Sequence, residues 1–463
     1  MTIQRFAELA RGNDLTAVAA ALRERPELAD MQMSYGDERQ PIHFAVMHRL
    51  PEMTRLLMRH GANARSGVHP HRSATTALVL AKERGFHDIA AIIEEEEPHR
   101  EEPAAVVEKK AAASEAVVAV ASGNIEWLRA RHAAGQLSNA IDWSEGGLLT
   151  AAVNHNQPEI LAVLLDFGFD PDERKEWRAE EPGISTQGIP LWQCAAMGRR
   201  EMAEMLLRRG ANPNAEVDSS GTPVYSAYSH HQWEMVDLLR RHGGIVKPGT
   251  AAIYRQTELA RQMLEDDARG ALQPGTVSNG RTLADSLLDF ACSGGASEIV
   301  GMALERIDWP RDDKRWFWFL QRPLDFWNHI PWLYAGNKEL SRDTYIECFR
   351  QVLARSNANV IGGFNRTVLH EVAAVGDHVT DEEAAPFAHA LLDAGARTDV
   401  RDEIFLSTPL GWACRWGRVP VARALLERDA DPVEANAEPW ARPLAWAEKM
   451  KRENVASLLG EYL

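Results

Sequence analysis

Gly188 to Asn212 reads GIPLWQCAAMGRREMAEMLLRRGAN, and a second version of it, GTPVYSAYSHHQWEMVDLLRRHGGI, follows 33 residues later at Gly221 to Ile245. Gly210 in the first stretch corresponds to Gly243 in the second. A fixed period of this length is typical of repeat proteins, in which each unit is too small to hold its own core and stacks on its neighbours. The sequence therefore predicts a stack of small units.

Each part of this unit has a physical role. Pro190 suits the first turn of a helix, because its missing N–H costs nothing there and its φ is already helical. A second helix at 201–209 presents Met202 and Leu206 on one face. Gly210 follows at the position where a left-handed residue ends a helix. The unit is therefore predicted to be helix, turn, helix and loop.

Short motifs recur at the starts of the first helices: TVLH at 367–370, TPLG at 408–411 and PIHFA at 41–45. With the helix-turn-helix order, they resemble the ankyrin repeat, whose signature is T-P-L-H-x-A. Units with this pattern are expected near 36–65, 72–94, 114–139, 146–172, 187–215, 220–246, 366–401, 407–434 and 441–463.

The resemblance implies an all-α, ankyrin-type helix-turn-helix solenoid with short hairpin-like loops and irregular central repeats. Residues 94–110, EEEEPHREEPAAVVEKK, are too poor in large apolar side chains to form a core face, although the residues after Pro103 also favour a helix. We expect N-terminal ankyrin-like repeats at 1–93, an acidic linker or charged helix at 94–113, ankyrin-like repeats at 114–305, an aromatic-rich insertion or enlarged repeat at 306–360, and C-terminal ankyrin repeats with a cap at 361–463.

The composition restricts the partners and the compartment. A formal net charge of −16 disfavours nonspecific binding to nucleic acid or to acidic membranes. The chain has no apolar run of about 18 residues, and residues 1–12 lack the apolar stretch of a signal peptide. The four cysteines are scattered within helical patterns, as small buried thiols are. We expect a cytoplasmic protein that binds neither nucleic acid nor membranes.

Catalytic motifs are scarce. His370 and Glu371 begin like the zinc motif H-E-x-x-H, but Ala374 stands where the second histidine should be. His370 is better interpreted as the histidine of the ankyrin motif. There is no phosphate-binding loop of the G-x-x-x-x-G-K type, no G-x-S-x-G elbow and no C-x-x-C pair. We expect no metal and no cofactor, and whether the chain is an enzyme stays open.

The resemblance implies that a protein partner binds to the groove formed by first helices and loop tips. Aligning the proline position of each unit predicts which residues lie there. These residues are Arg39, Met47, His48, Arg84, His155, Ser229, His230, Arg366, Phe405, Arg415 and Trp416. The partner's identity does not follow from the sequence.

Residues 306–342 break the periodicity and are rich in aromatic side chains. So many aromatic residues are expected to be mostly buried in an enlarged repeat. Alternatively they form a platform for a sugar or small-molecule ligand, since tryptophan dominates binding hot spots. That alternative describes a carbohydrate-active enzyme or sugar-binding protein with a Trp-lined acidic pocket. The platform would consist of Trp316, Trp318, Trp327 and Trp332.

Overall fold

The computed structural model describes residues 3–33, 38–68, 72–99, 115–139, 146–176, 184–186, 188–217, 221–277, 280–325, 343–375 and 379–463. Trp327, Trp332 and residues 100–113 of the expected linker lie outside the described residues. Within the described residues, the regular structure is helical apart from two short strands, which confirms the all-α helix-turn-helix fold.

The chain divides into two compact units. Unit 1 comprises residues 1–102, 310–324 and 353–463, and unit 2 comprises 103–309 and 325–352. The N-terminal residues 1–102 and the C-terminal residues 353–463 belong to the same unit. The first residues of the expected linker are helical, in α6 (His87–Glu96) and the 3-10 turn η3 (Glu97–His99).

Most helices of unit 1 come from the two ends of the chain, and one comes from residues 315–325. They are α1 (Ile3–Arg11), α2 (Leu15–Glu24), η1 (Pro26–Ala29), α3 (Pro41–Met47), α4 (Pro51–Arg59), η2 (Arg72–Ala74), α5 (Ala77–Glu83), α6, η3, α19 (Arg315–Asp325), η5 (Gly363–Asn365), α22 (Val368–Ala373), α23 (Asp381–Asp393), α24 (Pro409–Trp416), α25 (Val419–Leu426), η6 (Pro439–Ala441), α26 (Pro443–Lys449) and α27 (Glu453–Gly460). The last residue of α19 belongs to unit 2, and α21 (Asp343–Arg355) has residues in both units.

Unit 2 contains the repeats in which the 33-residue period is clearest. Residues 115–121 are helical and precede α8 (Ile125–Ala133). The other elements are α9 (Leu148–Asn154), α10 (Pro158–Asp166), β1 (Lys175–Glu176), β2 (Ile184–Thr186), α11 (Ile189–Met197), α12 (Arg200–Arg208), α13 (Pro223–Ser229), α14 (Trp233–Arg241), α15 (Pro248–Ile253), α16 (Thr257–Ala268), α17 (Leu283–Gly294) and α18 (Ser297–Leu304). Strands β1 and β2 pair antiparallel, Lys175 opposite Thr186.

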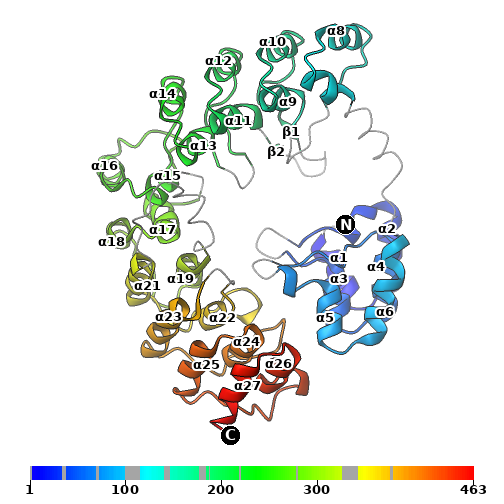
Figure 1. Ribbon diagram of the computed structural model, residues 1–463, viewed down its shortest axis with the longest axis vertical. Coiled ribbons are helices and arrows are strands. Elements are labelled where there is room, and N and C mark those ends of the chain that lie inside the picture. Colours follow the sequence, from blue (N-terminus) through cyan, green and yellow to red (C-terminus); the bar gives the residue numbers. More distant parts are fainter. Residues whose placement is uncertain are drawn as a thin grey trace. The chain divides into compact units, whose positions relative to one another are not determined.

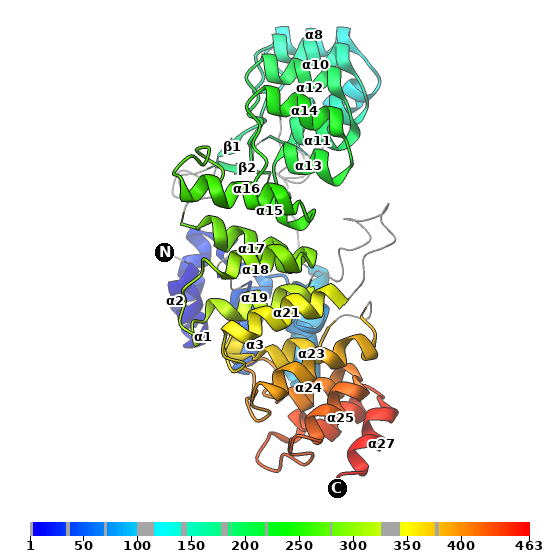
Figure 2. The ribbon, with the colours of Figure 1, turned by 90° about the vertical axis from the view of Figure 1, so that its left-hand side faces the viewer.

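Within each unit, consecutive helices pack as pairs, and neighbouring pairs stack on each other (Figure 1). In unit 2 the first helices α9, α11 and α13 contact one another in turn, as do the second helices α10, α12 and α14. Figure 2 shows α10, α12 and α14 following one another in a row. Each pair therefore contributes one layer to a continuous core, as the period predicts.

The residues that define the period form the ends of these helices. Pro190 and Pro223 lie in the first turns of α11 and α13. Gly210 and Gly243 follow α12 and α14 with φ of 90° and 89°, a conformation that L side chains adopt only at a cost. Leu206, on the buried face of α12, is completely inaccessible to solvent. The predicted unit is therefore present in its details.

Two buried histidines join neighbouring repeats. His370 accepts a hydrogen bond at Nδ1 from the backbone N of Thr367 at 3.0 Å, and its Nε2 lies 3.1 Å from the carbonyl O of Ser407. His43 makes the same contacts with its own N-cap backbone and with Ser66 O, 3.1 Å away. Burial lowers the pKa of His43 to about 4 and also lowers that of His370, so both rings are neutral at pH 7. His370 thus has the structural role of the motif histidine.

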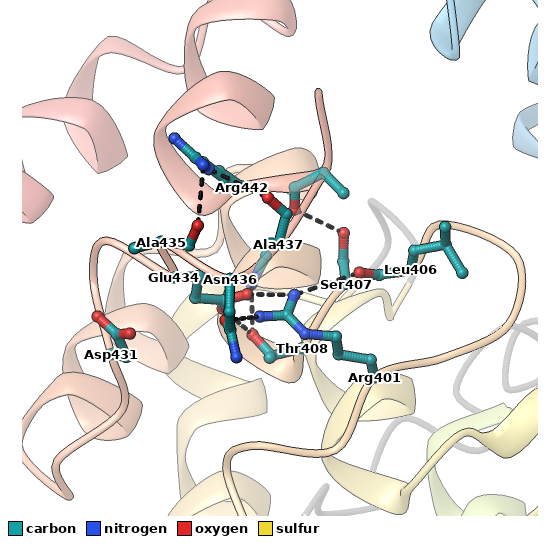
Figure 3. A network of polar contacts seen from close by, with 12 residues as sticks. Arg401, Leu406, Ser407, Thr408, Asp431, Glu434, Ala435, Asn436, Ala437 and Arg442 are labelled. Atoms are coloured by element: carbon teal, nitrogen blue, oxygen red, sulfur yellow. Dashed lines mark hydrogen bonds and ion pairs between the residues drawn. The ribbon is translucent and has the colours of Figure 1, made fainter. Parts of the chain in front are cut away.

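A polar network joins the loops on either side of α24 and α25 (Figure 3). Arg401 Nη1 lies 2.5 Å from Glu434 Oε2, and Arg401 Nη2 donates to Asn436 Oδ1 at 3.1 Å. The other Glu434 oxygen accepts from the Thr408 hydroxyl at 2.5 Å, and Thr408 caps the start of α24. Burial raises the pKa of Glu434 against these partners. The network orders the loops between repeats.

Candidate functional site

Three of the residues that the repeat alignment predicts for the groove are histidines at the ends of first helices. His48, His155 and His230 are the C-cap residues of α3, α9 and α13, and all three are exposed. Ser229, the last residue of α13, is half-buried, and its hydroxyl donates to Ser226 O at 2.8 Å. The three histidines therefore occupy equivalent positions in their repeats. Of the eleven residues predicted for the groove, His155, Ser229 and His230 belong to unit 2, and the other eight belong to unit 1.

Ring side chains from successive repeats make two sets of ring contacts, which together we call the aromatic row. Tyr228 lies edge-on to Trp233 with ring centroids 5.5 Å apart, and its ring centroid is 5.7 Å from that of Tyr254. Trp192 lies edge-on to His230 at 6.4 Å. The rings come from α11, α13, the start of α14 and the C-cap of α15. The aromatic row comprises Trp192, Tyr225, Tyr228, His230, Trp233 and Tyr254.

The aromatic row is open to solvent at Trp233. Trp233 is 54% exposed, and Met197, the last residue of α11, is 43% exposed. The end of α11 lies beside the α13–α14 turn, because a Cβ added at Gly198 would be 2.7 Å from Gln232 Oε1. Burial raises the pKa of the Tyr228 phenol, so the row is uncharged there. Such a surface can pack against apolar or planar side chains.

In unit 1, predicted residues of the N-terminal repeats contact the C-terminal repeats. Arg84, half-buried, donates through Nη1 to the carbonyl O of Met47 at 3.2 Å and through Nη2 to the carbonyl O of Ile404. The Arg39 guanidinium lies over the Phe364 ring, 4.4 Å from its centroid. Arg39 and Arg84 therefore contact the C-terminal repeats, and Met47 contacts Arg84.

The predicted residues of the C-terminal repeats are largely internal. Phe405 and Arg415 are buried, and Trp416 is half-buried with its ring 5.7 Å from that of Phe405. Arg366 is buried and forms a 2.9 Å ion pair with Glu371. Most of the residues predicted for the groove in this part of the chain are therefore engaged in contacts within unit 1.

The expected aromatic platform has different outcomes at its two described members. Trp316 is buried, and its Nε1 donates to Pro310 O at 2.8 Å. Trp318 is 37% exposed, but the Arg322 guanidinium lies 3.9 Å from its ring centroid and covers one ring face. A cavity of about 270 Å³ contains none of these tryptophans and is lined by Arg311, Asp312, Ser356, Asn357, Ala358 and Ala394.

The aromatic row was only partly predicted from the sequence, since of its members only His230 was singled out. The signal that could have identified it is the residue that opens the second helix. Trp233 stands where the preceding repeat has Arg200, directly before the matched glutamates Glu201 and Glu234. A large aromatic residue at a position that is polar in the neighbouring repeat is a sign of a surface function.

Three further features concern metals, membranes and thiols. Among the residues that the structure describes, no three His, Cys, Asp or Glu side chains are placed to hold a metal ion. In the same part of the chain, every helix is too short or too polar to cross a bilayer. All four cysteines, Cys194, Cys292, Cys348 and Cys414, are free and buried.

Comparisons with known proteins agree with the architecture. Models of the ankyrin repeat match residues 189–217 and 405–434. The chain is 25% identical over 228 residues to an ankyrin repeat domain-containing protein, SAT10, of Stachybotrys chartarum. It is 28% identical over 127 residues to an ankyrin repeat-containing protein of Treponema pallidum, and 26% identical over 144 residues to Rabankyrin-5 of Mus musculus.

These matches cover parts of each protein. They include 49%, 27% and 27% of this chain in the same order. They span 11%, 40% and 12% of the three relatives, so the chain covers well under two thirds of their length. The similarity to these three relatives is therefore a similarity of ankyrin repeats and does not extend to the whole proteins.

Proposed function

Because the chain is an ankyrin repeat protein, we propose that it is a scaffold that binds a protein partner through the aromatic row. The observation that carries this proposal is the exposure of Trp233 and Met197 on adjacent repeats. Contiguous exposed apolar surface on a folded protein marks an interaction site more often than an isolated apolar residue does. Ser229 and His230, which the register predicts for the groove, lie at the end of α13.

The geometry favours binding over catalysis. Tyr228 packs edge-on against Trp233, so the exposed indole is held in place before a partner arrives and loses little entropy on binding. Tyrosine and tryptophan dominate binding hot spots for the same reason. The charged groups next to Trp233 are already paired, since Arg200 lies 2.6 Å from Glu234. The partner that fits is a protein segment with a large apolar anchor side chain.

Selection of peptides from a random displayed library tests this proposal. Peptides selected on the wild-type chain should carry an aromatic or large aliphatic anchor, and their affinity should fall by about tenfold or more for Trp233→Ala, the loss expected at a hot spot. Tyr462→Ala is a matched control, because Tyr462 is also exposed but lies at the end of the last repeat. Peptides that bind equally to wild type and to a folded Trp233→Ala/Tyr228→Ala variant would rule out the aromatic row.

A further inference from the structure

The last residue of α5 reaches into the C-terminal repeats. Glu83 Oε1 lies 2.7 Å from Arg415 Nη1, and the two side chains are only 10% and 6% exposed. The carbonyl O of Glu83 also accepts a hydrogen bond from Lys449 Nζ, a residue 366 positions later in the sequence. Two cations of the C-terminal repeats therefore hold one residue of the N-terminal repeats.

The receiving side of this contact is built by the C-terminal repeats alone. Arg415 is the next-to-last residue of α24, and Lys449 is the last residue of α26. The Arg415 guanidinium lies within 5 Å of three ring centroids, and Arg415 Nη1 also donates to Met450 Sδ at 3.7 Å. The three rings are those of Phe405, Trp416 and Trp446.

A guanidinium held between aromatic faces is oriented before a ligand arrives. Cation–π contacts fix its position, while its N–H groups stay directed at an acceptor. Arginine in this state favours carboxylates, because a charge-assisted hydrogen bond to a carboxylate oxygen is stronger than one to a neutral group. Lys449 lies over the Trp446 ring at 5.4 Å and adds a second positive charge. The arrangement has the chemistry of a carboxylate-binding pocket.

Glu83 fills this pocket imperfectly. Among the described groups, no hydrogen-bond partner reaches the buried atoms Glu83 Oε2, Arg415 Nε and Arg84 Nε. Each is shielded from bulk water, and no protein group among the described residues takes the place of that water. Burial raises the pKa of Glu83 and lowers that of Arg415, so desolvation opposes the charged pair. A contact with unmet hydrogen bonds is one that a better ligand can displace.

We propose that the pocket around Arg415 and Lys449 is a binding site for the carboxylate of an acidic protein segment, and that Glu83 is an internal ligand that occupies it until such a segment displaces it. The pocket is separate from the aromatic row, since it lies in unit 1 and the row in unit 2. The net charge of −16 repels an acidic segment from the chain as a whole. Binding of such a segment therefore requires a local site.

The test uses the full chain and a fluorescein-labelled hexaglutamate peptide, with binding measured by fluorescence anisotropy at low and high salt. We expect weak binding to wild type and at least tenfold tighter binding to Glu83→Ala, because the internal carboxylate is gone. Adding Arg415→Met, which keeps the stem between the rings but removes the charge, should abolish the gain. Glu52→Ala, a change at an exposed glutamate of α4, should bind like wild type.

Several outcomes would overturn the proposal. Unchanged affinity of Glu83→Ala would show that Glu83 blocks nothing, and tight binding that survives Arg415→Met would show that the peptide binds elsewhere. Hydrogen exchange of α5 reports folding of the variants and should rise in Glu83→Ala while α24 stays protected. Trp233→Ala should leave hexaglutamate binding unchanged, so this proposal and the one for the aromatic row fail separately.

Discussion

Two regions of the molecule use equivalent repeat positions in opposite ways. In the aromatic row, the end of α13 carries Ser229 and His230, and His230 is exposed, as is Trp233 at the start of α14. In the C-terminal repeats, the end of α24 carries Arg415 and Trp416, and there Arg415 is buried against Glu83 of the chain's own N-terminal repeats. The same place in the repeat is open in one region and occupied in the other.

The difference teaches that repeat register and surface availability are separate properties. Register depends on local helix geometry, which is common to every unit. Availability depends on what else the chain brings to that surface, and in unit 1 the residue that covers it comes from α5. Changes to each region should therefore have different consequences for stability and for binding.

The largest effect should come from Trp412, the centre of the occupied region. Its indole is completely buried, and its Nε1 donates to Asp402 Oδ1 at 2.9 Å. Trp412→Ala should lower the free energy of unfolding by about 3–5 kcal/mol, the loss expected for a truncated core tryptophan. Urea unfolding followed by far-ultraviolet circular dichroism measures it. A loss of less than about 1 kcal/mol would mean that the surroundings of Trp412 are not a packed core.

Acid should weaken unit 1 through its buried histidines. His43 has its pKa lowered from 6.5 to about 4, so between these values the unfolded chain holds one proton that the folded chain does not. Stability therefore falls as pH drops from 6.5 to about 4, by about 3 kcal/mol for His43. Urea unfolding at several pH values should show that the free energy of unfolding depends less steeply on pH in His43→Gln than in wild type. Met53→Ala, which destabilises the same repeat but keeps the histidine, should retain the wild-type slope.

A smaller effect is expected from Glu173, at the start of the stack that carries the aromatic row. Its carboxylate accepts hydrogen bonds from Gly147 N at 2.7 Å and Leu149 N at 2.8 Å, and from the Thr150 hydroxyl at 2.6 Å. Glu173→Ala leaves these donors buried and should cost about 1–3 kcal/mol. Glu159→Ala, a change in the first turn of α10, is the control for urea unfolding. Equal stability of the two variants would contradict a stabilising role of the Glu173 carboxylate at the start of α9.

Local features were predictable from the sequence because they depend on neighbouring residues. Pro190 and Gly210 identified a helix start and a helix end from their own backbone preferences. The repeat alignment also indicated that His155 and His230 occupy equivalent positions, and both are C-caps. Such inferences need only the geometry of one unit.

Contacts between distant repeats were not predictable in the same way. Nothing near Arg415 in the sequence indicates that Glu83 approaches it, because the pairing depends on the arrangement of many units. Phe405 was expected in the groove, but it is buried among the rings that hold Arg415. Trp233 was not singled out, because an aromatic residue in an amphipathic helix is more often part of the core.

The smallest effect on stability, and the one that defines the open region, belongs to Trp233. Because 54% of the Trp233 surface is exposed, Trp233→Ala should change the free energy of unfolding by no more than about 0.5 kcal/mol. The same variant should lose most of its affinity for peptides selected on wild type. The main effect of Trp412→Ala should instead be a lower free energy of unfolding. Urea unfolding and peptide titration of both variants measure the two effects separately. If Trp233→Ala destabilises the chain as much as Trp412→Ala, the indole is structural, and the contrast between an open and an occupied region disappears.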